Sequence, residues 1–300
     1  MRSLVLFGLS LVVSVSASVE LQINYHDSVG IPQAERIRVI ETEILAKNLG
    51  HNDLLQNRIV GGQETAPHAF PYFAGLLIDL VGTNARSVCG ASLLTPNRLV
   101  TAAHCWLDDT DQAFQFLVVL GSNFLYNGGE RIYTKTVITH PHYDKSSNDV
   151  AVIYLPRNAR IDNFRVKPIN LPNESELRNQ FVGYPAVATG FGKMSDKTNK
   201  LSRVLRHVNL TVISKAECAS VFKRGLVTSN HICTSGSGGV GICSGDSGGP
   251  LVTFDNNRQP FLIGIIAFCA VQCDEGAPSG SSRVTSFYTF ITQHLQIAQK

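Results

Sequence analysis

The pattern of hydrophobic and polar positions divides the chain into three stretches. In the first, Met1 and Arg2 precede an apolar run from Leu4 to Val15, which ends at small residues 16–18. This order is typical of a secretory signal peptide, and the run is too short to span a bilayer. An N-terminal membrane anchor is the alternative, but the chain contains no second hydrophobic segment that is longer than this run. We therefore predict a signal peptide over residues 1–18 and a secreted, extracellular protein with no membrane partner.

The second stretch, residues 19–58, carries one amphipathic pattern. Its apolar residues recur near helical spacing: Ile37, Ile40, Ile44 and Leu45. They precede Asn48 and Gly50, which are residues that end helices. The pattern predicts a small helical segment. The stretch also contains no cysteine, so no disulfide can attach it to the rest of the chain.

The third stretch, after Arg58, consists of short β-branched or aromatic runs broken by Gly, Pro, Asn and Asp. Such runs are expected to be strands: Leu117–Leu120, Tyr133–Thr139, Val150–Leu155 and Leu262–Phe268. One C-terminal pattern instead fits an amphipathic helix packed on the body: Phe287, Phe290, Ile291, His294 and Leu295. The stretch is therefore predicted to be all-β with a C-terminal helix.

Composition narrows the function classes. The 300 residues are 44% hydrophobic and 16% charged, with a formal net charge of +3 and no clustered Lys/Arg stripe. This is a globular composition that argues against a nucleic-acid partner. All seven cysteines lie between Cys89 and Cys273. In a secreted chain they are expected to pair, and zinc is disfavoured because the cysteines and histidines lack ligand spacing.

A serine flanked by glycines is the strongest local signal. The run from Cys243 to Pro250 reads CSGDSGGP, with Ser247 at its centre. Glycines allow the tight backbone that exposes a hydroxyl, although such a serine alone would be an ordinary turn. Two further segments change that interpretation: TAAHC around His104 and NDVAVI around Asp149.

These three residue types suit nucleophilic catalysis. A serine hydroxyl needs an adjacent imidazole to accept its proton and return it to the leaving amine, which is the role expected of His104. Asp149 would accept the other imidazole N–H, and the apolar run after it indicates a buried carboxylate that needs a partner. A surface aspartate between strands is the alternative for Asp149.

The order His, Asp, Ser and the three motifs resemble those of chymotrypsin-like, trypsin-fold serine endopeptidases. The resemblance runs from Ile59 to about Leu295. It implies two packed six-stranded antiparallel β-barrels with a C-terminal α-helix, and a catalytic triad of His104, Asp149 and Ser247 in the cleft between them. The backbone N–H groups of Gly245 and Ser247 would form the oxyanion hole. The spacing and pocket also resemble arthropod digestive chymotrypsins and collagenolytic relatives.

The resemblance divides the chain into a signal peptide (1–18), an activation pro-segment (19–58) and a protease domain (59–300). The sequence RIVGG at Arg58 resembles the activation junction of this family. Cleavage there would free the ammonium of Ile59, which would turn inward to pair with Asp246. Arg58 predicts a trypsin-like activating protease as a partner. The other expected partners are protein or peptide substrates and protein inhibitors. The protein is expected to be a monomer.

The resemblance also implies the disulfides Cys89–Cys105, Cys218–Cys233 and Cys243–Cys273. Cys269 is the seventh cysteine. It is expected either at the mouth of the primary pocket, on the strand lining the substrate channel, or as a buried, inert small side chain.

By the same resemblance, Gly241 stands at the base of the primary pocket, where trypsin-like members have an aspartate, so the base carries no negative charge. The implied substrate-binding residues are Gly241, Ile242, Ser244, Ala267, Phe268, Cys269 and Ser279. With Ile242 and Cys269 intruding, the pocket should favour apolar side chains, as in chymotrypsin-like or elastase-like enzymes. Asp274 and Glu275 are either surface charge or groups close enough to admit a basic side chain. Ala267 stands where relatives place a serine that supports the triad aspartate, which predicts reduced activity rather than loss.

No cofactor or metal is expected. Glu130 is the sole carboxylate in the loop that binds calcium in some relatives, and a hard cation needs several oxygen ligands. Asn173 and Asn209 lie in glycosylation sequons. The competing class of function is a non-enzymatic binding or regulatory protein on the protease fold, although such homologues usually lack a triad member.

Overall fold

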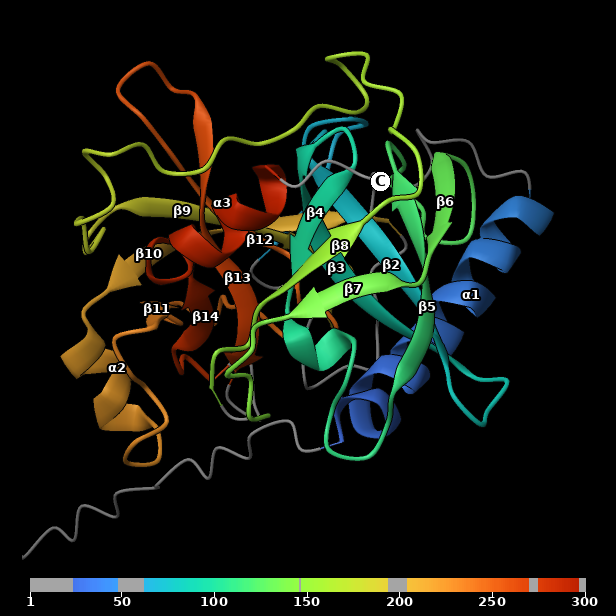
Figure 1. Ribbon diagram of the computed structural model, residues 1–300. Helices are drawn as coiled ribbons and strands as arrows, with labels where there is room; N and C mark the ends of the chain where they lie inside the picture. Colours follow the sequence, from blue (N-terminus) through green and yellow to red (C-terminus); the bar gives the residue numbers. More distant parts are fainter. Residues whose placement is uncertain (1–23, 48–61, 146, 194–203, 270–274, 297–300) are drawn as a thin grey trace, which may run out of the picture.

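The computed structural model describes residues 24–47, 62–145, 147–193, 204–269 and 275–296 (Figure 1). These residues form two β-sheet units and three α-helices, with short π- and 3₁₀-helical turns between them. The predicted signal peptide, Arg58, Ile59, Cys273 and Asp274 lie outside these residues. In the part that is described, no helix is long and apolar enough to cross a membrane.

The C-terminal unit is a closed, six-stranded antiparallel barrel. Its strands are β9 (Pro185–Gly190), β10 (Arg206–Ile213), β11 (His231–Thr234), β12 (Pro250–Phe254), β13 (Pro260–Cys269) and β14 (Ser279–Arg283). Strand β9 pairs with both β10 and β12, which closes the ring. The short strand β1 (Gln63–Glu64) adds to β10. Side chains such as Phe181, Leu251 and Ile263 fill its core.

The N-terminal unit is an antiparallel sheet with the order β6-β5-β2-β3-β4-β8-β7. Its strands are β2 (Phe73–Leu80), β3 (Arg86–Thr95), β4 (Arg98–Thr101), β5 (Ala113–Leu120), β6 (Glu130–Thr134), β7 (Thr136–Thr139) and β8 (Ala151–Tyr154). The edge strands β6 and β7 are separated in the chain by Lys135 alone. The predicted all-β class is confirmed, but this unit is a half-barrel in its strand pairing, not a second closed barrel.

The C-terminal helix α3 (Tyr288–Gln296) is confirmed, and it follows a short 3₁₀ turn, η4 (Val284–Ser286). Ile291 of α3 is fully buried, as the amphipathic pattern requires. Helix α2 (Lys215–Val221) was not predicted. Its N-cap residue is Ser214, whose side chain accepts the N–H of Glu217 and so caps the first turn.

The N-terminal segment, defined as residues Tyr25–Ala46, is also helical. A π-helical turn, η1 (His26–Gly30), leads without a break into α1 (Ile31–Ala46), which has Pro32 in its first turn. Ala34 and Ile37 pack against the N-terminal unit, in a cluster with Phe73 and Leu117. Figure 1 shows α1 lying along that unit beside β5.

The predicted apolar face of α1 is only partly correct. Leu45 is 56% exposed, whereas Ile37 and Ile44 are buried. Two polar residues of the same segment, Gln33 and Glu41, are each 1% exposed. The buried face of α1 is therefore set by what the helix meets on the protein body, and polar groups there need partners.

Candidate active site

Strand register brings His104 and Asp149 together. His104 lies in the 3₁₀ turn η3 (Ala103–Cys105) just after β4, and Asp149 lies just before β8. Because Thr101 of β4 pairs with Ala151 of β8, the residues after one strand and before the other are neighbours. His104 Nδ1 is 2.7 Å from one carboxylate oxygen of Asp149, and the backbone N–H of His104 donates to the other at 2.9 Å.

This two-point contact fixes the imidazole. Burial alone would raise the pKa of Asp149, but the His104 ring and the backbone N–H groups of His104 and Ala103 outweigh it and lower that pKa. Asp149 therefore stays ionised, and its side chain is only 13% exposed. An ionised carboxylate at Nδ1 holds the proton on that nitrogen and leaves Nε2 as the basic one.

Ser247 comes from the other unit, in the turn before β12. The N–H of Gly90 in β3 donates to the Ser247 carbonyl at 2.7 Å, which joins this turn to the N-terminal unit. Gly248 has a φ of +77°, and a Cβ there would lie 2.4 Å from the Gly90 carbonyl oxygen. This close approach of two backbones requires a glycine after Ser247. His104 and Ser247 are thus placed on facing edges of the two units.

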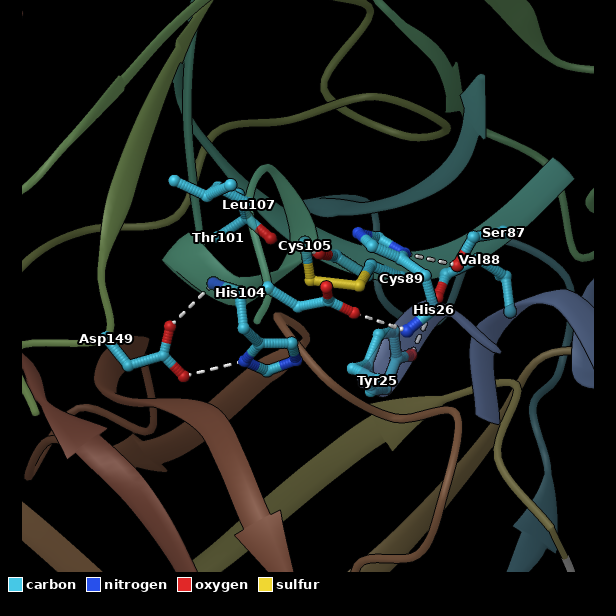
Figure 2. Close-up of a disulfide and its surroundings, with 12 residues drawn as sticks. Tyr25, His26, Ser87, Val88, Cys89, Thr101, His104, Cys105, Leu107 and Asp149 are labelled. Atoms are coloured by element: carbon cyan, nitrogen blue, oxygen red, sulfur yellow. Dashed lines mark hydrogen bonds and ion pairs between the residues drawn. A yellow bond between two sulfur atoms is a disulfide. The ribbon is translucent and has the colours of Figure 1, made fainter. Parts of the chain in front are cut away.

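Tyr25 of the N-terminal segment lies at this junction. Its ring packs edge-on against the His104 imidazole, with centroids 4.7 Å apart, and its hydroxyl donates to the Val88 carbonyl at 2.7 Å. The Ser247 hydroxyl hydrogen-bonds to the same phenol. Tyr25 and Asp149 lie on opposite sides of the His104 ring (Figure 2). Among the residues described, His104 Nε2 has no hydrogen-bond partner, so the Ser247 hydroxyl points to Tyr25 rather than to the imidazole.

Asp246 is enclosed beside Ser247. Its two carboxylate oxygens accept the backbone N–H groups of Gly192, at 2.8 Å, and Cys243, at 3.0 Å. A Cβ on Gly190 or Gly192 would lie 2.1 or 2.5 Å from the carboxyl group, so glycines line its enclosure. Burial raises the pKa of Asp246 to about 6, although these N–H groups and the distant Arg206 oppose the rise. Such a carboxylate is stabilised by any cation placed against it.

The residues expected around the primary pocket divide into two groups. Cys269 of β13 pairs with Ser279 of β14, so these two lie side by side. Gly241 and Ser244 are half-buried on the loop before Ser247. Ile242 packs in the core of the C-terminal barrel, and its carbonyl accepts the Ser279 hydroxyl at 3.4 Å.

Ala267 and Phe268 precede Cys269 on β13. Both side chains belong to a cluster with Phe222 and the Cys218–Cys233 disulfide, and the Phe268 ring centroid is 5.2 Å from that of Phe222. A Cβ on Gly280 would lie 2.1 Å from the Phe268 ring, so only glycine fits opposite it. The Ser282 hydroxyl donates to the backbone carbonyl of Asp149 at 2.7 Å. The Asp149 side chain accepts the N–H groups of His104 and Ala103.

The predicted disulfides Cys89–Cys105 and Cys218–Cys233 are confirmed. Cys243 is also oxidised, and its expected partner, Cys273, lies outside the described residues. Cys269 is a buried thiol, 6% exposed, and packs against Cys243.

One cluster in the described part has side chains close enough for metal ligands: Cys89, His104 and Cys105. The two sulfurs form a disulfide and cannot act as thiolates, so these residues do not fit a metal. Glu130 of the predicted non-calcium loop forms an ion pair with Arg157 and accepts the N–H of Arg160. Both oxygens of this carboxylate are thus already paired, one with the Arg157 guanidinium and the other with a backbone N–H.

Four buried residues of the N-terminal segment had no signal in the sequence: Tyr25, His26, Gln33 and Glu41. Sequence alone placed a helix near them but not the surface against which it packs. A buried role for Gln33 and Glu41 is opposite to what their polarity predicts.

Comparison with known proteins identifies the class to which this site belongs. The Trypsin family profile matches residues 59–291. A collagenase of Hypoderma lineatum is 36% identical over 82% of this chain and 90% of its own length. Brachyurin of Leptuca pugilator is also 36% identical, over 78% of this chain and 96% of its own. The solved HL collagenase superimposes with a TM-score of 0.71 at 35% identity, covering 80% of this chain and all of its own.

The chain therefore belongs to the trypsin family of serine proteases. Within that family it is a chymotrypsin-like serine endopeptidase of the arthropod branch, and its substrates are proteins.

Proposed function

We propose that the chain is the secreted precursor of an endopeptidase that cleaves peptide bonds with a triad of Ser247, His104 and Asp149. The observation that carries the proposal is the two-point contact between His104 and an ionised Asp149, at 2.7 and 2.9 Å, with Tyr25 in contact with both His104 and Ser247. This arrangement leaves Nε2 of His104 as the basic nitrogen for Ser247, the second serine of the CSGDSGGP motif.

The reaction follows from these positions. His104 Nε2 takes the proton of the Ser247 hydroxyl as its oxygen attacks the scissile carbonyl, and the imidazolium is stabilised by Asp149. The N–H groups of Gly245 and Ser247 stabilise the negative oxygen of the tetrahedral intermediate. His104 then protonates the leaving amine, and water hydrolyses the acyl-enzyme by the reverse sequence.

Cleavage after Arg58 is the proposed activation step. It would create an ammonium at Ile59 that pairs with Asp246. The carboxylate of Asp246 supports this step. Burial raises its pKa to about 6, and a cation placed against it would offset the cost of burying its negative charge. The peptide between Asp246 and Ser247 then links that ion pair directly to the nucleophile.

Substrate preference is proposed to be for apolar side chains. Cys269 and Ser279 form adjacent walls without charge, and Gly241 aligns with the pocket base. Secretion through residues 1–18 is part of the same proposal. It is compatible with the two sequons, since Asn173 and Asn209 are both exposed.

The test is to cleave the purified chain at Arg58 with a trypsin-like protease, label it with a fluorophosphonate and profile a peptide library. We expect labelling of wild type, none of Ser247→Ala, and cleavage after apolar residues. An intact Arg58→Ala chain should stay unlabelled. Absence of labelling in fully cleaved, segment-free wild type would favour the alternative, a non-enzymatic binding protein.

A further inference from the structure

The surface beside the triad is covered by the chain's own N-terminal segment. We propose that this segment, Tyr25–Ala46, is a reversible inhibitor of the site that remains bound as a separate peptide after cleavage at Arg58. The inference rests on the proposed function for its activity readout, but its binding readout is independent of catalysis.

The first observation is how Tyr25 occupies the site. The residue is fully buried, with its ring against His104 and its phenol hydrogen-bonded to both Val88 and Ser247. The attacking hydroxyl is thereby directed away from the base that must accept its proton. A substrate carbonyl would have to displace this ring, because the phenol already contacts the Ser247 hydroxyl and the ring packs on His104.

The second observation is that polar anchors extend along the whole segment. The backbone N–H of His26 donates to the Asp108 carboxylate at 2.8 Å. The imidazole Nδ1 of His26 is 2.7 Å from the Ser87 hydroxyl (Figure 2). Gln33 donates to the Phe191 carbonyl at 2.6 Å. Its side chain also covers the oxyanion loop, since a Cβ on Gly245 would lie 3.0 Å from Gln33 Cγ.

Glu41 provides the third anchor. Its carboxylate accepts the N–H groups of Leu125, at 2.6 Å, and Tyr126, at 2.9 Å, and the side-chain amide of Asn127 at 3.1 Å. These contacts satisfy a carboxylate that is 1% exposed. Each of these three buried polar residues makes at least one hydrogen bond to the protease body, and both oxygens of the Glu41 carboxylate are paired. Such contacts are more specific than the packing of an amphipathic helix requires.

The segment resists cleavage because of its conformation. Residues from His26 onward are helical, so their backbone groups bond within η1 and α1 instead of pairing as an extended strand along the cleft. No cysteine lies in residues 19–58, so only these contacts hold the segment once Arg58 is cut. The inhibition should therefore be relieved by dilution.

The binding test uses the full-length Ser247→Ala chain cleaved at Arg58, followed by size-exclusion chromatography and native mass spectrometry. We expect the segment to co-elute with the protease domain at micromolar concentration. Separation of the two at that concentration would overturn the proposal. The activity test uses cleaved wild type, whose rate of fluorophosphonate labelling per molecule should rise on dilution.

Tyr25→Ala should weaken retention about 100-fold or more, from the loss of a buried aromatic ring. Val39→Ala is the matched control, because Val39 lies on the same helix and is 43% exposed. Once separated from the segment, all variants should have the same turnover, since they share one protease domain. Equal retention of wild type and Tyr25→Ala would refute the inhibitory role of the ring.

Gly30 gives a second, independent variant. A Cβ there would lie 1.8 Å from Ser87 Oγ and 3.1 Å from Ser87 Cβ, so Gly30→Ala must displace the hydroxyl that contacts His26. The change favours helix in the released peptide, yet it should weaken retention about 10-fold. In a Ser87→Ala background the same change should cost much less, and an undiminished cost there would contradict the docked geometry.

Discussion

Acidification should release the N-terminal segment from the cleaved protein, and His26 is the reason. The residue is fully buried when docked, its Nε2 has no hydrogen-bond partner among the described residues, and burial lowers its pKa to about 4 from an ordinary 6.5. Asp108 and Asp111 act to raise that pKa, and His104 acts to lower it. Protonating His26 therefore favours the released state.

The sign and size follow from linkage. Because the docked pKa is depressed, the contribution of neutral His26 is fully present above pH 6.5 and is lost as the pH falls toward 4. Between pH 8 and pH 5 the segment should bind about 30-fold more weakly, and the limit below pH 4 is about 300-fold, or about 3 kcal/mol. Glu41 opposes this trend, since burial outweighs its hydrogen bonds and raises its pKa, which favours docking in acid.

The assay is retention of the segment by the cleaved Ser247→Ala chain from pH 5 to 8, which removes the pH dependence of catalysis from the readout. His26→Asn should flatten the profile, and Glu41→Gln should steepen it. His294→Asn is the control, because His294 lies on α3 and contacts Tyr154 instead of the segment. An equally steep profile in His26→Asn would refute the reasoning.

Three further outcomes are expected. Asp149→Asn should reduce kcat about 10⁴-fold in steady-state assays while leaving the fold intact, because it stabilises the wrong tautomer of His104; a loss below 10-fold would contradict the triad. Asp246→Asn should prevent activation, so that the chain cleaved at Arg58 shows at least 100-fold slower fluorophosphonate labelling; normal labelling would exclude the proposed ion pair. Replacing both Cys89 and Cys105 by alanine, which opens a loop of 16 residues, should lower the free energy of unfolding by about 3 kcal/mol in urea titrations, and an unchanged midpoint would contradict the stabilising role of the disulfide.

Much of the active site could be predicted from local sequence. The motifs around His104, Asp149 and Ser247 appear in a fixed order, and each is short enough to be recognised without long-range information. The pairing of Cys89 with Cys105 followed from the same resemblance. The two amphipathic helices could be predicted because helical periodicity is a property of neighbouring residues.

Tertiary structure decided what the N-terminal helix does. Tyr25 is an isolated aromatic residue in a polar stretch, and Gln33 and Glu41 resemble exposed helix residues. Their burial depends on groups far along the chain: Val88 for Tyr25, and residues 125–127 for Glu41. Likewise, the packing of Ile242 in the barrel core was decided by its tertiary contacts. The sequence by itself determined which chemistry the chain carries, because catalytic motifs are local. Which surface covers that chemistry was decided by packing between residues more than 60 positions apart, which no local pattern records.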